Sequence, residues 1–144
     1  MSRKKIVLLA AGSIILVTAF YAYKEYTRKK PNLHSVSSAY GITDSLLINE
    51  FIKNEQLSNS KYLGKIVSVT GQVKQLDKDG NTVTIVLGSM HNASSVKCAM
   101  DSTEKTANVQ LSETITVKGA CIGFNKDDLI GSDVILNRCV LINQ

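Results

Sequence analysis

The chain has 144 residues and a formal net charge of +5, so we expect one folded domain. Residues 1–30 carry seven Lys/Arg against one Glu (+6), whereas residues 31–144 carry ten Lys/Arg against eleven Asp/Glu (−1). The nearly neutral domain excludes the broad basic surface of proteins that bind nucleic-acid backbones.

The N-terminal segment predicts a membrane anchor. Residues 6–23 form an uncharged run of 18 residues, and at about 1.5 Å per residue such a helix is just long enough for a hydrocarbon core of roughly 30 Å. Basic residues lie on both sides of the run, and tyrosines cluster at its distal end, where the membrane interface favours them. We predict a single transmembrane helix within an anchor or signal segment, residues 1–28. A signal peptide cleaved near Val17-Thr18-Ala19 is the alternative.

The basic residues do not decide the orientation, because three precede the run and four follow it. A span this close to the N-terminus is typical of a signal anchor that exports the domain after it. We therefore expect a single-pass protein of the cell membrane, with its domain on the extracytoplasmic side, in the periplasm.

Residues 29–43, which contain the only proline, Pro31, predict a linker. From Asp44 to Leu57 the pattern is helical, because Leu47, Ile48, Phe51 and Ile52 form one apolar stripe. Either Thr43 or Asp44 can cap the start of this helix.

The rest of the chain predicts five strands. The first, residues 62–73, alternates Val67, Val69, Gly71 and Val73 on one face, and its mid-strand glycine indicates a bend. Asp79-Gly80 predicts a hairpin turn into the second strand. A change of phase at Asn137-Arg138 predicts a bulge in the last strand. The other four strands are expected at residues 82–87, 95–100, 113–122 and 133–142.

Five short strands of antiparallel type favour a small closed barrel, and Gly71 and Gly119 occupy matching mid-strand positions. We predict an all-β (small α+β) domain over residues 44–144. Its fold is a five-stranded barrel of the oligonucleotide/oligosaccharide-binding (OB) type, with the helix 44–57 capping one end.

A resemblance to a known family rests on several segments in order: Asn54-Glu55, residues 61–66, residues 69–73, residues 96–98, residues 117–123 and residues 133–139. Together they resemble the tRNA-anti-like family of small OB-fold envelope proteins, over about residues 44–142. The resemblance implies the fold and no particular activity.

Three cysteines fall on predicted inward faces. If the last two strands pair about Ile130, Cys121 and Cys139 lie opposite one another, which would permit a disulfide in an exported domain. Cys98 with Cys139 is the competing pair, and three buried free thiols are the plain alternative. No metal site is expected, because no paired cysteine or histidine spacing is present.

Recognisable catalytic motifs are absent, so we expect no enzyme activity and no cofactor. We predict a binding or interaction module for an unknown protein or small molecule. Its ligand face is expected on the outward sides of the second and third strands and on loops 76–82 and 123–131. The candidate ligand-binding residues are Lys74, Thr82, Thr84, Lys97, Phe124, Asn125 and Lys126.

A nucleic-acid partner is not expected. Single-strand binding by OB domains uses aromatic rings on the second and third strands, and residues 82–87 and 95–100 contain none. Phe124 is the single candidate stacking ring. A single-stranded oligonucleotide-binding OB domain is the alternative function.

Overall fold

A computed structural model of the chain describes residues 3–27 and 32–142, with side chains described for residues 14–27 and 32–142. The chain divides into two compact units, residues 1–31 and 32–144.

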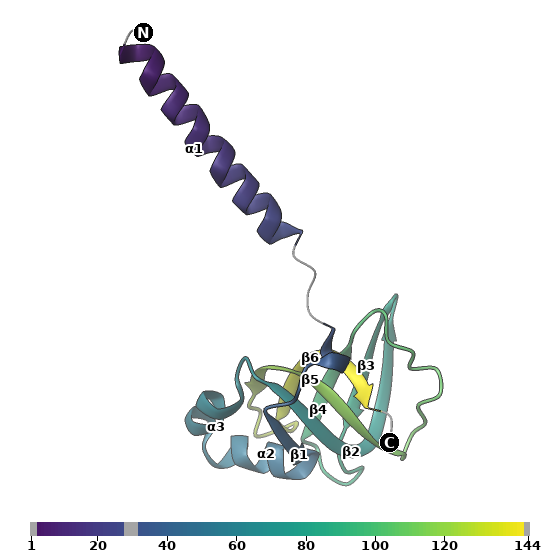
Figure 1. Cartoon of the computed structure of the whole chain (residues 1–144). Helices are drawn as coiled ribbons and strands as arrows, with labels where there is room; N and C mark the ends of the chain where they lie inside the picture. The colour runs from purple at the N-terminus through teal and green to yellow at the C-terminus, as the bar shows by residue number, and fades with distance from the viewer. Residues whose placement is uncertain (1–2, 28–31, 143–144) are drawn as a thin grey trace. The chain divides into compact units, whose positions relative to one another are not determined.

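The first unit contains one helix, α1 (Arg3–Tyr26) (Figure 1). The predicted span, residues 6–23, falls within α1, and the side chains of residues 6–13 lie outside the described part. Large apolar side chains of the described part are solvent-exposed, including Ile14, Leu16 and Phe20. The described residues contain no helix with both the length and the hydropathy needed to cross a membrane.

The second unit is built on six strands, of which five follow one another around a closed ring of hydrogen bonds (Figure 1). They are β1 (Tyr40–Thr43), β2 (Ile66–Asp79), β3 (Thr82–Leu87), β4 (Ser95–Met100), β5 (Thr114–Asn125) and β6 (Asp133–Ile142). The order is β1-β2-β3-β4-β6-β5, and β5 also pairs with β2. The five expected strands form this ring: β3 lies between β2 and β4, β6 lies between β4 and β5, and β5 closes the ring against β2. β1 is attached to the ring through β2.

Two features of the sheet differ from expectation. β1 is a sixth strand, inside the segment expected to be a linker, and it runs parallel to β2 from Tyr40 opposite Val67 to Thr43 opposite Thr70. β4 and β6 are also parallel, so the sheet is mixed rather than antiparallel throughout. The four residues of β1 are too few to display an alternating pattern, so this strand could not be predicted from periodicity.

The predicted helix 44–57 is two helices, α2 (Asp44–Lys53) and α3 (Glu55–Tyr62). Asn54 has an extended backbone (φ −155°) that ends α2, and its side-chain oxygen accepts a hydrogen bond from the Leu57 N–H at the start of α3. Thr43, one of the two predicted caps, accepts from the Leu46 N–H at 3.4 Å. A short 3₁₀ helix, η1 (Leu33–Ser35), precedes β1.

The hydrophobic core lies inside the ring, and α2 closes one end of it. Leu47, Ile48 and Phe51 of α2 pack against the inward valines of β2, β4, β5 and β6. The core cluster, with the partly buried side chains packed against it, is drawn from residues 42–141, and Leu33 of η1 is buried as well.

The two mid-strand glycines provide room for neighbouring side chains. Neither has a positive φ. A Cβ at Gly71 would lie 2.6 Å from the Asp44 Oδ2 at the start of α2, and a Cβ at Gly119 would collide with the Sγ of Cys139. Each glycine therefore accommodates a neighbouring side chain that packs directly on the backbone.

The expected facing of Cys121 and Cys139 is wrong. β5 and β6 pair with Cys121 opposite Leu136. The predicted bulge is confirmed, because the register shifts there and Arg138 adopts a φ of +53°. All three cysteines are buried free thiols. A thiol hydrogen bond to Cys139, together with complete burial, raises the pKa of Cys98.

Candidate functional site

The two ends of the strand ring are closed differently. α2 fills one end, whereas the irregular segment 101–113 (the cover loop) closes the other. At this second end the apolar side chains are only half-buried: Leu76, Val83, Val109, Ile115 and Leu141. Because these side chains complete the core at its edge, this end is where a ligand can reach apolar surface.

The cover loop is fixed by hydrogen bonds to the ring. The Asp101 N–H donates to the Cys139 carbonyl at 2.8 Å, and the Ser112 N–H donates to the Val73 carbonyl at 2.8 Å. The Asp101 carboxylate accepts from the N–H and hydroxyl of Thr103. The cavities beneath the loop are therefore formed before any ligand arrives, which lowers the entropy lost on binding.

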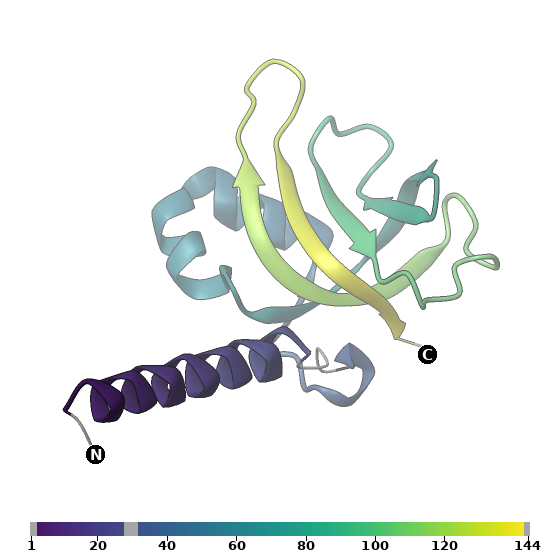
Figure 2. The ribbon, with the colours of Figure 1, turned by 90° about the horizontal axis from the view of Figure 1, so that it is seen from above.

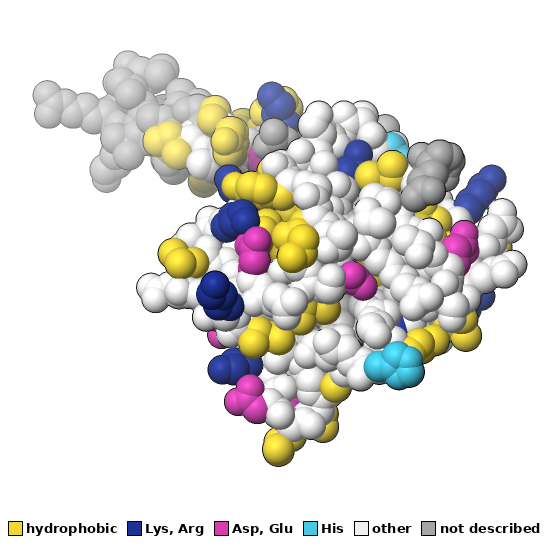
Figure 3. Space-filling view, turned by 90° about the horizontal axis from the view of Figure 1, so that it is seen from below, with side chains coloured by type: hydrophobic (Ala, Val, Ile, Leu, Met, Phe, Trp, Pro, Cys, Tyr) yellow, Lys and Arg dark blue, Asp and Glu magenta, His cyan; other side chains and the backbone are white. Residues whose placement is uncertain are grey.

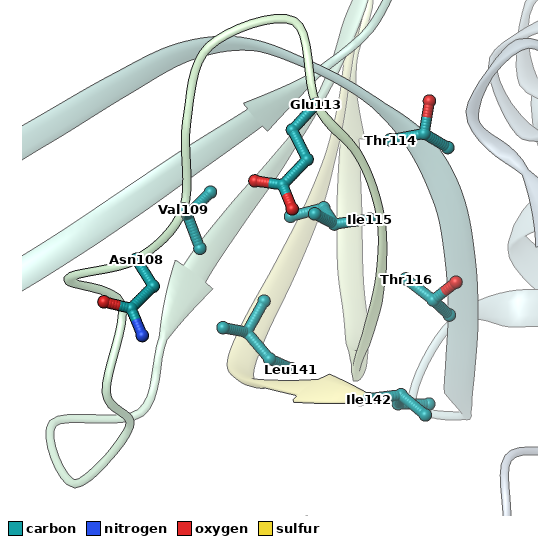
Figure 4. Close-up of a pocket in the computed structure, with 8 residues that line it drawn as sticks. All are labelled: Asn108, Val109, Glu113, Thr114, Ile115, Thr116, Leu141 and Ile142. Carbon is teal, nitrogen blue, oxygen red and sulfur yellow. The ribbon is translucent and has the colours of Figure 1, made fainter. Parts of the chain in front are cut away.

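One cavity, the end pocket, has a volume of about 220 Å³ (Figure 4). The loop that carries Asn108 and Val109 arches over the ends of β5 and β6, which contribute Ile115 and Leu141. The aliphatic side chains form its floor and polar groups form its rim. The lining residues are Asn108, Val109, Glu113, Thr114, Ile115, Thr116, Leu141 and Ile142.

The exposed Glu113 carboxylate is the charged group at this rim. Its Oε2 accepts a hydrogen bond from the Gln110 N–H at 3.0 Å, which fixes its position. A carboxylate has more acceptor sites than this single bond uses. The rim can therefore accept further hydrogen bonds from an ammonium, a guanidinium or an N–H.

A second cavity, the loop groove, lies between the β2–β3 hairpin and the cover loop and has a volume of about 460 Å³. Lys78 and Lys105 supply its positive charges, and Asn108 belongs to both cavities. Its lining residues are Lys78, Gly80, Asn81, Val83, Ser102, Glu104, Lys105, Thr106, Ala107 and Asn108.

The segment before β1 is attached to this part of the ring. The Lys118 ammonium donates to the carbonyls of His34 (3.2 Å) and Val36 (2.9 Å). His34 Nε2 lies 2.9 Å from Glu104 Oε2, and Glu104 Oε1 accepts from the Leu141 N–H. Both carboxylate oxygens of Glu104 thus contact other residues of the domain, so Glu113 is the better candidate for contacting a ligand.

Two lysines of the predicted ligand face are already engaged. The Lys74 ammonium donates to the Asn92 carbonyl at 2.6 Å. Lys97 lies 2.6 Å from Asp133, which also accepts from the Ser95 hydroxyl. The positive charges of Lys74 on β2 and Lys97 on β4 are therefore used within the protein itself.

The remaining predicted residues lie in two separate places. Thr82 and Thr84 are on β3, where Thr84 pairs with Asp77 and Ala99. The Phe124 ring is stacked on the Phe51 ring with centroids 5.0 Å apart, so it belongs to the core. Asn125 and Lys126 are exposed where the β5–β6 loop begins.

The cover loop was not foreseen as a site. One signal was present: a connection of 13 residues without regular structure is long for a small domain, and such loops are often functional. Chemically, the site offers hydrogen-bond acceptors, amides and hydroxyls above an aliphatic floor. Among the described residues, no group of three or more His, Cys, Asp or Glu could hold a metal ion.

Comparisons with known proteins identify the family. A model of the tRNA_anti-like family matches residues 1–140, which confirms the family resemblance. No curated protein is significantly similar to the sequence.

One solved structure shows the same fold, and two others are more weakly similar. A Klebsiella pneumoniae protein described as a "putative nucleic acid-binding lipoprotein" superposes with a TM-score of 0.51 at 15% identity, over 71% of this chain and 91% of that chain. An aspartyl-tRNA synthetase from Entamoeba histolytica has a TM-score of 0.40 at 11% identity, over 58% of this chain and 19% of that chain. A Leishmania major Friedlin protein described as a "putative aspartyl-tRNA synthetase" has a TM-score of 0.43 at 10% identity, over 88% of this chain and 26% of that chain.

Proposed function

The chain belongs to the tRNA_anti-like family, and from this premise we propose that it is a non-catalytic, membrane-anchored binding module with an OB-type domain. It takes a peptide segment of a partner protein at the ring end under the cover loop. The observation that carries the proposal is the end pocket, in which a preformed aliphatic floor lies beside a carboxylate with free acceptor sites.

The size and lining of the end pocket favour a peptide side chain. Its volume of about 220 Å³ is below the roughly 300–1,000 Å³ of typical small-molecule pockets. Val109, Ile115 and Leu141 suit one aliphatic side chain. Glu113 favours a neighbouring cation and disfavours a phosphate. A peptide with an aliphatic residue next to Lys or Arg therefore matches the pocket best.

Membrane attachment through residues 6–23 is supported by the uncharged run and by its basic flanks. In the described part of α1, a continuous row of large apolar side chains is solvent-exposed, with Ile15, Leu16 and Val17 between 67% and 73% exposed. A soluble unit seldom leaves so much contiguous apolar surface in water. The domain then lies on the extracytoplasmic side of the membrane.

Two measurements test this attachment. A reporter enzyme that is active only in the periplasm, fused after residue 144, should be active, and an inactive reporter would refute the orientation. The N-terminal sequence of protein extracted from the membrane should retain residues 6–23. Recovery of a chain that begins after Ala19 would instead identify a cleaved signal peptide.

The binding proposal is tested with a library of displayed random peptides selected on the full chain in lipid nanodiscs. Selected peptides should be enriched in aliphatic residues next to Lys or Arg. Their affinity should fall at least about tenfold, or 1.4 kcal/mol, in Glu113→Lys. Glu55→Lys reverses an equally exposed carboxylate on α3 and should leave the affinity unchanged. Equal binding to both variants would refute the site.

A second candidate, binding of single-stranded oligonucleotides, is favoured by Lys78 and Lys105 in the loop groove and by the description of the Klebsiella pneumoniae protein. The groove has no aromatic lining residue, so it lacks the stacking contribution of about 1–3 kcal/mol per base. Fluorescence anisotropy with a labelled oligothymidine at low salt tests this function. Binding that is lost in Lys78→Glu with Lys105→Glu, and kept in Lys53→Glu, would support it. No change in anisotropy would end it.

A further inference from the structure

The loop between β5 and β6, residues 126–132 (the tip loop), presents two large aliphatic side chains to solvent. β5 and β6 run side by side as long curved strands, and the loop that joins them projects from the ring (Figure 2). Leu129 is 95% exposed and Ile130 is 79% exposed. Adjacent aliphatic side chains with this exposure at the apex of a loop are typical of an interaction site.

The tip loop has a fixed shape. The Asp127 carboxylate accepts the N–H of Leu129 at 2.8 Å and of Ile130 at 3.0 Å, and the Ile130 and Leu129 N–H groups lower the pKa of Asp127. Gly131 has a φ of +98° and lies so close to Ala93 that no Cβ would fit. The two aliphatic side chains are therefore presented with little conformational entropy left to lose.

A complementary surface lies between α2 and α3. This helix pocket has a volume of about 350 Å³ and is lined by Glu50, Lys53, Asn54, Leu57 and Ser58. Leu57 is 67% exposed, so the helix pocket offers apolar contact at its surface. Its size is sufficient for two aliphatic side chains.

The charges around the helix pocket favour an acidic partner. The Glu50 carboxylate is already neutralised, because it lies 2.9 Å from the Lys61 ammonium and accepts from the Tyr62 hydroxyl at 2.8 Å. Lys53 is exposed and forms no ion pair with any residue that the structure describes. The tip loop carries the exposed Asp128 beside its aliphatic pair, so loop and pocket are complementary in both charge and apolarity.

Both surfaces lie on the α2 side of the ring. The Phe51 ring of α2 stacks on the Phe124 ring at the end of β5, immediately before the tip loop. The face seen from below carries hydrophobic side chains interspersed with basic and acidic ones (Figure 3). A two-fold axis can pair loop with pocket twice, because α2, which lines the pocket, packs against the end of β5 from which the loop projects.

We propose that two copies of this chain associate through these surfaces, with Leu129 and Ile130 of each copy inserted into the helix pocket of the other and Asp128 placed beside Lys53. The interaction surface is separate from the end pocket and the loop groove, so it does not depend on the proposed ligand.

A second copy fits better than a lipid surface. The carboxylates of Asp127 and Asp128 adjoin the aliphatic pair, and transferring carboxylates into a bilayer is costly. A second copy instead meets them with Lys53. Confinement of the chain to a membrane would raise the effective concentration of copies, which compensates for a small interface.

Charge reversal is the first test. Sedimentation of the full chain in detergent, from about 10 µM to about 1 mM, covers the range of weak association. Leu129→Asp and Lys53→Asp should each weaken dimer formation at least about tenfold. Asp128→Lys should do the same, and the double variant Asp128→Lys with Lys53→Asp should restore it. A monomer at every concentration, or a dimer whose dissociation constant is unchanged by all of these substitutions, would overturn the proposal.

Cross-linking in lipid vesicles tests the contact directly. Because the native cysteines are buried, a mixture of Leu57→Cys and Ile130→Cys chains should form a disulfide-linked dimer under mild oxidation. Leu111→Cys replaces another exposed aliphatic residue, a leucine of the cover loop (58% exposed), and should not cross-link to Leu57→Cys. Equal cross-linking by Leu111→Cys and Ile130→Cys would show random collision and refute the interface.

Discussion

Gly119→Ala tests the packing of the strand ring most directly. The added Cβ would overlap the Sγ of Cys139, and it would also approach the Asn137 carbonyl oxygen and the Leu136 Cβ, each at 3.3 Å. Cys139 is fully buried, so its side chain has no free space to enter. Overpacking of a core costs about 1–3 kcal/mol, whereas replacing glycine by alanine recovers about 0.4–1 kcal/mol through the unfolded chain. We expect a net loss of about 1–2 kcal/mol.

Urea unfolding followed by circular dichroism measures this loss as a lower midpoint at unchanged slope. Gly123→Ala is the matched control, because no heavy atom lies within 4 Å of a Cβ at this position in the same strand. It should change stability by no more than about 0.5 kcal/mol.

A rescue identifies the colliding atom. Cys139→Ala removes the thiol that occupies the space over Gly119. The double variant should therefore be more stable than the sum of the two single changes predicts, by about 1 kcal/mol or more. Additive losses, or a Gly119→Ala variant as stable as Gly123→Ala, would refute the close approach of β5 and β6 described for this site.

Three further changes report on other parts of the domain. The Lys61 ammonium and the Tyr62 hydroxyl lower the pKa of Glu50. Their contribution to stability is therefore present above the pKa of an unfolded glutamate, and it is lost as pH falls through the lowered pKa. Because the ion pair is half-exposed, Glu50→Gln should cost about 0.5 kcal/mol at neutral pH and nothing in acid, measured by urea unfolding at each pH. Thr43→Ala removes the cap of α2 and should cost about 1 kcal/mol, whereas Thr43→Ser should retain most of it. The three buried thiols of the reduced protein should resist alkylation while folded and react fully in denaturant, and rapid modification of the folded protein at any of them would contradict their burial.

The strand framework could be predicted because its residues alternate over enough positions to reveal one face. Val83, Ile85 and Leu87 in β3, and the change of phase at Asn137-Arg138 in β6, are both direct consequences of which side chains reach the core. Features that depend on distant contacts could not be predicted in the same way. The register of Cys121 opposite Leu136 depends on where the β5–β6 bulge absorbs a residue.

The division of the helix at Asn54 had a local signal, since asparagine before an acidic residue is a typical helix start. The candidate site had a weaker signal in the sequence. The end pocket depends on where the cover loop lies across β5 and β6, and no periodic pattern in residues 101–113 encodes that position. The sequence alone makes Phe124 a candidate base-stacking ring, because its partner, Phe51, is 73 positions away in the chain and packs on it only after folding.

The pairing of β2 with β5 also determines when the domain can fold. Ile66 pairs with Ala120, and β6 must then be placed between β4 and β5. A chain synthesised from its N-terminus therefore lacks at least one closing strand until residues 133–142 have emerged, and contacts this distant form slowly. The ring cannot assemble while the first strands are still alone. The proposed export of the domain is compatible with this order of assembly, because a chain that has not closed its ring can cross a translocation channel as an unfolded polypeptide.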